Sequence, residues 1–326
     1  MMSKVISFNT EVDVSKCTWG LELEFGDIPR DLVIPPELGS WESFETDVVN
    51  QLGMYRGIAC DPSGINPPVG GEINTVPTAS IDDQIKLVEE LLRFFRSNGY
   101  DPTTSCVSNT HVHVHVPGYH DTFLKNTRKL LVFMLKHQDQ MLDKTYAFNP
   151  DPRMQDTKSA TVYLVQDSGR SIDISKAYRI VRDIMSPEQF YDMYEIDKRD
   201  PSKRYAINLM PLRYESRTIE FRCFRSTKNL KQLQDIMLFC HKFLTEALND
   251  AWSKHMWTAI DQNSPENLSL FKLALEFDKQ RSGIDLFGDR DYDFPRLDYD
   301  HELYLGWEDT KHSPDFLRKK QHKNLL

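Results

Sequence analysis

The sequence predicts one α+β domain elaborated with helices. Short stretches alternate apolar and polar residues with the two-residue period of a β-strand, and longer stretches between them repeat apolar residues at helical spacing. The 326 residues show no internal repeat, no low-complexity linker and no sharp break in composition. A chain of this length can bury a complete core, so a single large domain is the simplest organisation.

Strands are predicted where the alternation is clearest. The first covers residues 20–25, where Glu22 and Glu24 point to one face while leucines and a phenylalanine point to the other. An irregular, proline-containing stretch is expected over 26–40. Further strands are expected over 54–60, 71–77, 105–116, 204–210 and 217–224, with one short candidate over 161–165 in an otherwise looped stretch, 143–171.

Helices are predicted where apolar residues recur at helical spacing after a capping residue. Ser80 is such a cap, because acidic residues follow it in the first turn and Gly99 follows the end of the apolar pattern. Serine followed by proline marks two other helix starts. We expect further helices over 121–144 and 228–252 and from Pro187 and Pro265, an ordered loop over 285–309, and a frayed basic tail.

Composition excludes several classes of protein. A hydrophobic content of 40% is that of a folded chain, and a net charge of −9 argues against a general nucleic-acid or membrane-surface binder. The five cysteines are scattered without a C-x-x-C pair, as expected of free thiols in a reducing compartment. No stretch has the length and apolar character of a membrane span or a signal peptide, so we expect a cytoplasmic location.

Glu22 and Glu24 are the first candidate site residues. Two carboxylates on one strand face repel each other unless a cation lies between them, and divalent metals take carboxylate oxygens. The alternative is a half-exposed strand with an acidic outer face, which this pair alone would favour.

Two later strands add polar side chains of the same kind. His111, His113 and His115 share one strand face, which favours a role with metal or phosphate over packing. Glu220 and Arg222 also share a face, with Thr218 and Phe224 expected beside them. This pair is either a surface ion pair or a metal ligand beside a phosphate clamp.

Together these motifs resemble the amidoligase family of the carboxylate–amine ligases, with glutamine synthetase and glutamate–cysteine ligase. The motifs are GLELEF, GGEINTVP, THVHVHV and RYAINL followed by TIEFRCFRST, in that order between residues 20 and 227. No glycine-rich P-loop or dinucleotide fingerprint is present, so phosphates would be held by metals and arginines. We therefore expect a catalytic core over 1–227 and a helical part over 228–326 that packs on the same domain.

The resemblance implies a glutamine synthetase-like, curved, mostly antiparallel sheet around a site for ATP and Mg²⁺ or Mn²⁺. It implies Glu24 with Glu72 at one ion, and Glu22 with Glu220 and a histidine at another. Alignment favours His111 as that ligand and His113 as a phosphate or substrate contact, whereas a shift of two residues gives His113 and His115. Further residues implied in the site are Arg222 and Arg204 for phosphates and Asn208 for the substrate.

The expected reaction is ATP-dependent amide formation between a small-molecule or peptide carboxylate and an amine, through an acyl phosphate. Glu22, Glu24, Glu220 and Arg222 would carry the chemistry. A small-molecule kinase of the guanidino type on the same fold is the nearest alternative, and a metal-dependent hydrolase using the three histidines is another. A regulatory protein without turnover is disfavoured because the acids, histidines and arginines are all present.

Overall fold

The structure, a computed structural model, describes residues 12–29, 31–41, 69–104, 109–141, 166–167, 171–172, 174–183, 185–194 and 207–249, with 269, 272 and 273. Several sequence predictions lie outside the described residues: the strands over 54–60 and 161–165, the helix from Pro265, the loop over 285–309, the basic tail and the position of Arg204.

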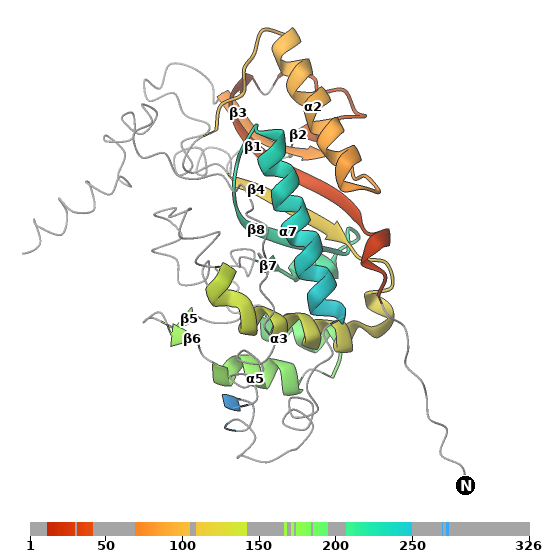
Figure 1. The fold of residues 1–326 in the computed structure, drawn as a ribbon, viewed down its shortest axis with the longest axis vertical. Coiled ribbons are helices and arrows are strands. Elements are labelled where there is room, and N and C mark those ends of the chain that lie inside the picture. Colours follow the sequence, from red (N-terminus) through yellow and green to blue (C-terminus); the bar gives the residue numbers. More distant parts are fainter. Residues whose placement is uncertain are drawn as a thin grey trace, which may run out of the picture.

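The described fold is built on one antiparallel sheet of six strands in the order β2-β3-β1-β4-β8-β7 (Figure 1). β1 and β4 lie in the middle, so the first strand of the sequence is also a central one. The strands are β1 (Thr18–Pro29), β2 (Gly39–Trp41), β3 (Val69–Thr75), β4 (Asn109–His115), β7 (Ile207–Asn208) and β8 (Thr218–Arg225); β5 (Gln166–Asp167) and β6 (Ser171–Ile172) pair separately.

Helices cover one face of this sheet. α7 crosses in front of β1, β4 and β8, α2 lies beside it, and α3 contacts both α7 and α5 (Figure 1). The α-helices are α2 (Ile81–Ser97), α3 (Phe123–Met141), α5 (Ile174–Asp183), α6 (Pro187–Tyr194) and α7 (Leu230–Asn249), and the 3-10 turns are η1 (Val14–Lys16), η2 (His120–Thr122) and η5 (Met210–Arg213). No described helix is long and apolar enough to cross a bilayer. The predicted α+β class is confirmed.

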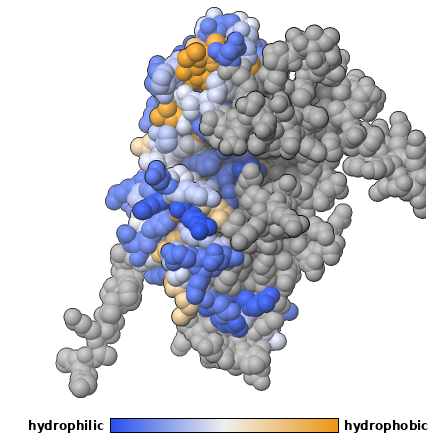
Figure 2. Space-filling view, turned by 180° about the vertical axis from the view of Figure 1, so that it is seen from behind, coloured by the Kyte–Doolittle hydropathy of each residue, from blue (hydrophilic) through white to orange (hydrophobic). Residues whose placement is uncertain are grey.

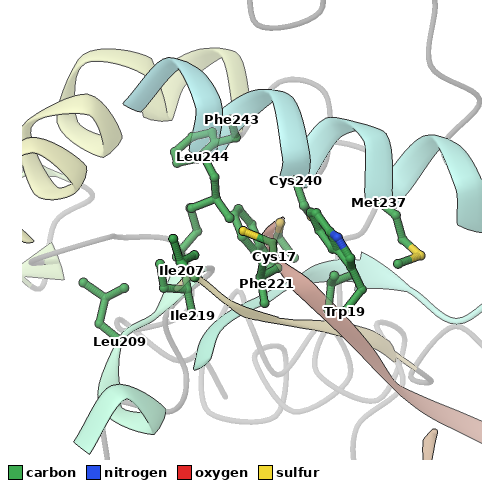
Figure 3. Packing of buried hydrophobic residues seen from close by; sticks show 14 of the residues in the cluster. Cys17, Trp19, Ile207, Leu209, Ile219, Phe221, Met237, Cys240, Phe243 and Leu244 are labelled. Atoms are coloured by element: carbon green, nitrogen blue, oxygen red, sulfur yellow. The ribbon is translucent and has the colours of Figure 1, made fainter. Parts of the chain in front are cut away.

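The core lies between the sheet and α7. Figure 3 shows strand side chains such as Trp19 and Phe221 directed towards Cys240 and Phe243 of α7. The rings of Phe221 and Phe243 meet edge to face with centroids 5.6 Å apart, a favourable aromatic geometry. Because the apolar residues of each strand take this side, the alternating polar residues lie on the opposite face of the sheet.

The helix starts agree with the sequence, whereas β2, β5, β6 and α5 were not predicted. Ser80 Oγ accepts a hydrogen bond from the Asp83 amide at 3.1 Å and so caps α2, and α6 begins at Pro187 as expected. The expectation of an irregular stretch over 26–40 is wrong at both ends, since β1 continues to Pro29 and β2 begins at Gly39. The expectation of a loop over 143–171 is wrong at its end, where β5 and β6 pair, and helix α5 follows them.

A β-bulge in β8 corrects one face assignment. The register shifts so that Arg222 and Cys223 both lie opposite His111. Phe224 therefore turns to the core, where its ring centroid lies 5.9 Å from that of Phe239 on α7. The expectation that Phe224 shares the face of Thr218 and Glu220 is wrong.

Candidate functional site

The polar face of the sheet gathers the predicted residues from five strands. Its register pairs Glu24 with Glu72 and pairs Glu22 with His111. One step along, Glu220 lies opposite both His113 and Asn208. Residues far apart in the chain thus lie on neighbouring strands, about 4.8 Å apart across the sheet, with β4 between Glu22 on β1 and Glu220 on β8.

The carboxylates on this face are buried. Glu24 and Glu220 are 1% and 3% exposed, and Glu72 and Glu22 are 8% and 9% exposed. An acidic outer face in contact with solvent does not fit these values. Buried carboxylates are costly unless they are paired or hold a cation, so the burial points to a built site.

Glu22 lies at the centre of a histidine cluster. Its Oε1 is 2.6 Å from His111 Nδ1, and its Oε2 is 3.1 Å from His113 Nε2. Burial raises the pKa of the Glu22 carboxyl, but the charge of His111 and hydrogen bonds from Glu72, His111 and His113 outweigh it, and the pKa lies well below its usual range. Glu22 is therefore held as a carboxylate.

Glu220 is held by two donors. Arg222 forms an ion pair with its Oε1, and Asn208 Nδ2 donates to its Oε2 at 2.6 Å. The Met210 amide donates to Asn208 Oδ1 at 3.0 Å and fixes the orientation of that side chain. Burial raises the pKa of Glu220, yet Arg222 and the histidines lower it overall, so this group is also charged.

One group of side chains has the geometry of a metal site. Ligand atoms of Glu22, His113 and Glu220 all lie within 4.8 Å of one another. Two carboxylates and one imidazole suit a hard or borderline divalent cation, and the residues therefore fit the metal that the sequence implied. His113 Nδ1 lies 3.3 Å from Thr218 Oγ1, which would orient the ring.

The three histidines of β4 have different neighbours. His111 is 1% exposed and contacts Glu22 without belonging to the metal-type group, so its assignment as the ligand stays a prediction. His115 lies farther along β4, with Nδ1 3.3 Å from the Arg217 carbonyl. Thr218 was not singled out from the sequence, although its place two residues before Glu220 puts it on the same face.

The surroundings of this face combine polar surface with one apolar pocket. Figure 2, which views the molecule from the side opposite α7, shows mainly hydrophilic surface over the described part and a hydrophobic patch at the end where α2 lies. A pocket of about 540 Å³ lies beside β2, lined by Trp41 and Val76 among other apolar residues, and by Asn74. Asn74 pairs with Glu22, so the pocket adjoins the acidic row.

The chain was then compared with known proteins. The sequence model of a family described as "Putative amidoligase enzyme" matches residues 46–244. The chain belongs to the amidoligase family. The match includes Glu72, the three histidines and Glu220, while Glu22 and Glu24 precede it. A search of curated proteins found no match to this chain.

Membership of this amidoligase family indicates an enzyme that forms amide bonds, with small molecules as substrates. The geometry is compatible with that indication, because a buried acidic cluster with an arginine beside it is suited to phosphoryl chemistry. Among the described residues, the metal-type group includes one of the three histidines, His113.

Proposed function

We propose that this amidoligase is an ATP- and Mg²⁺-dependent carboxylate–amine ligase that works through an acyl phosphate. The observation that carries the proposal is the group of Glu22, His113 and Glu220, whose carboxylates are buried and whose imidazole is half-buried, with Arg222 bound to Glu220. The proposal includes the relation to glutamine synthetase, a catalytic core over 1–227 and a cytoplasmic location.

The acidic face supplies two places for a divalent cation. Glu22, His113 and Glu220 would hold one ion, with His111 as the alternative histidine, and the Glu24–Glu72 pair would hold the other. When bound, Mg²⁺ or Mn²⁺ neutralises the charge that spreads over a transferring phosphoryl group. Carboxylate oxygens are the ligands these ions prefer.

Arg222 would bind the phosphates of ATP. Burial lowers the pKa of the Arg222 guanidinium, but the charges of Glu220, Glu22 and Glu72 outweigh it and raise the pKa overall, so the side chain stays cationic. Its planar fork matches two phosphate oxygens. Arg204, outside the described residues, is a second candidate.

The reaction would proceed in two steps. An oxygen of the substrate carboxylate attacks the γ-phosphorus of ATP, and ADP leaves. A neutral amine then attacks the acyl carbon, inorganic phosphate leaves, and a histidine or carboxylate of the face takes the amine proton. Asn208, His113 and His115 line the places where the substrate would lie next to Glu220.

A thermal-shift and product experiment tests this function. We expect Mg²⁺ with ATP to raise the melting temperature more than Zn²⁺ alone, and ADP release to require both a carboxylate and an amine from a pooled set of amino acids, peptides and polyamines. Mass spectrometry would detect the amide. A stable phosphorylated product without amide would instead identify a kinase, and stabilisation by Zn²⁺ without ATP turnover would identify a hydrolase.

A further inference from the structure

A second group of polar side chains lies at the end of the polar face, beyond His113 and Glu220. It consists of His115, His120, Tyr191, Arg213 and Arg217, and we call it the basic cluster. His115 lies opposite Thr218 in the register of β4 and β8, so it continues the row that contains His113. The other members come from η2, α6, η5 and the residue before β8.

Arg217 is fixed by its backbone. Its carbonyl lies 3.3 Å from His115 Nδ1, and its amide donates to the Tyr214 carbonyl at 3.1 Å. Its φ of 46° lies in the left-handed region, which residues other than glycine rarely adopt. Such backbone strain is found preferentially at ligand sites.

Two buried donors of the cluster lack a partner. His120 Nε2 and the Tyr191 hydroxyl have no hydrogen-bond partner among the described residues, and Tyr191 is only 5% exposed. Phe123 joins them, with ring centroids 5.6 Å from His120 and 5.7 Å from Tyr191. Burial, and then the charges of Arg217 and His115, lower the pKa of His120.

The cluster has an excess of positive charge. Arg213 lies with its Cζ 5.7 Å from the centre of the Tyr191 ring. Within the described part of the chain, neither Arg213 nor Arg217 forms an ion pair. Carboxylates near it in the described chain include Glu188, which is exposed and accepts a hydrogen bond from Ser186, the exposed Asp121, and the exposed Glu215, two residues from each arginine.

We propose that the basic cluster binds a second carboxylate of the substrate, so that the substrate is a long dicarboxylate, either a diacid or a peptide that carries an acidic residue. This rests on the proposed function, in which the reacting carboxylate lies beside Glu220. Arg217 lies just before β8, and its neighbour Thr218 and His115 are one pair farther along the register than His113 and Glu220, so several bonds must separate the two carboxylates. The guanidinium groups would bind the carboxylate, and the unpartnered hydroxyl and imidazole would donate to it.

Binding without nucleotide or metal tests the cluster separately from the reaction. We would titrate the protein calorimetrically with suberate, which has two carboxylates, with propionate, which has one, and with inorganic phosphate. We expect suberate to bind more tightly than propionate, and Arg217→Gln together with Arg213→Gln to weaken suberate binding about tenfold or more. Arg217→Asn, which tolerates the left-handed backbone, should weaken suberate binding similarly while retaining the melting temperature. Arg93→Gln, a matched exposed site on α2, should leave binding unchanged.

The outcomes separate the two proposals. Equal binding to the wild type and the double variant, or phosphate binding more tightly than every carboxylate, would overturn the second-carboxylate site. With an amine present, ADP release should show a KM for suberate raised about tenfold in Arg217→Gln with kcat little changed. Arginine-dependent suberate binding without any ADP release would refute the ligase while retaining the cluster.

Discussion

At the scale of single residues, the polar face concentrates buried acids. Four carboxylates, those of Glu22, Glu24, Glu72 and Glu220, are buried on it. Arg222 pairs with Glu220. Burial lowers the pKa of His113, but Glu22 and Glu220 raise it more, so this ring gains a proton easily when no metal is bound. A divalent cation would take the place of that proton.

Glu220→Gln should therefore remove the stabilisation that a bound metal gives to the folded protein. The wild type should gain a few degrees in melting temperature on addition of Mg²⁺ or Mn²⁺, because a ligand that binds only the folded state stabilises it. The variant should lose this gain and about a hundredfold or more of ADP release. Glu89→Gln, exposed on α2, is the matched control. A full metal-dependent gain in Glu220→Gln would contradict the metal assignment.

Substitutions of His111 and His113 should affect metal binding to different extents in the same assay. His113 shares the metal-type group with Glu22 and Glu220, so we expect His113→Gln to abolish stabilisation by Mn²⁺. His111→Gln should reduce it by about tenfold in affinity, because His111 only orients Glu22 through its 2.6 Å contact. The reverse order, measured as Mn²⁺ affinity by calorimetry or electron paramagnetic resonance, would favour the ligand assignment His111.

Part of the site could be predicted from the sequence because alternation in a strand fixes which side chains share a face. That rule identified Glu22 with Glu24, the histidine row and Glu220. It could not choose between His111 and His113, because the choice depends on the register between β4 and its neighbours. It also failed at Phe224, where the bulge adds one residue to β8.

At the scale of elements, local signals predicted helices better than short strands. α2 begins after a capping serine, and α6 begins at the proline of a Ser-Pro pair. In both cases the residues at the helix start predict it. β2 has three residues, and its pairing with β3 defines it as a strand. The residues 39–41 alone have no pattern that predicts a strand. A short stretch of sequence contains no signal for pairing with a distant strand.

Removing the cap of α2 should have a measurable cost. Ser80 Oγ accepts from the Asp83 amide at 3.1 Å, and α2 contacts both β1 and α7. Ser80→Ala should lower the free energy of unfolding by about 1 kcal/mol. Ser97→Ala at the other end removes a hydroxyl that only donates to the Phe94 carbonyl and should cost less than about half of that. Urea denaturation of both variants measures the difference, and equal costs would argue against the cap.

At the scale of the whole molecule, the sheet divides the fold into an apolar and a polar side. β1, β4 and β8 contribute to both sides at once: Leu21 and Phe221 face α7 while Glu22 and Glu220 face the site. Since α7 completes the core, loss of its packing would loosen the strands that position the acids. Changes that lower the free energy of unfolding should therefore also weaken metal binding, and bound metal should raise the free energy of unfolding.

Buried thiols allow this coupling to be measured. Cys17, Cys223 and Cys240 are buried, and burial raises the pKa of Cys17 to about 12 and that of Cys240 well above its usual range. Because the thiolate is the reactive form, these protonated thiols should react with Ellman's reagent at pH 8 at least about a thousandfold more slowly than free cysteine. Cys60→Ser and Cys106→Ser would remove the thiols outside the described residues.

In that double variant the remaining thiols should become reactive in one step as urea unfolds the sheet and α7, and Mg²⁺ with ATP should shift the step to higher urea. The fully denatured chain, titrated in the same way, calibrates the number of reactive thiols. A thiol that reacts at the rate of free cysteine in native buffer would contradict the burial of the core. A urea midpoint unaffected by Mg²⁺ with ATP, while those ligands still bind, would show that the polar face and the α7 core open independently.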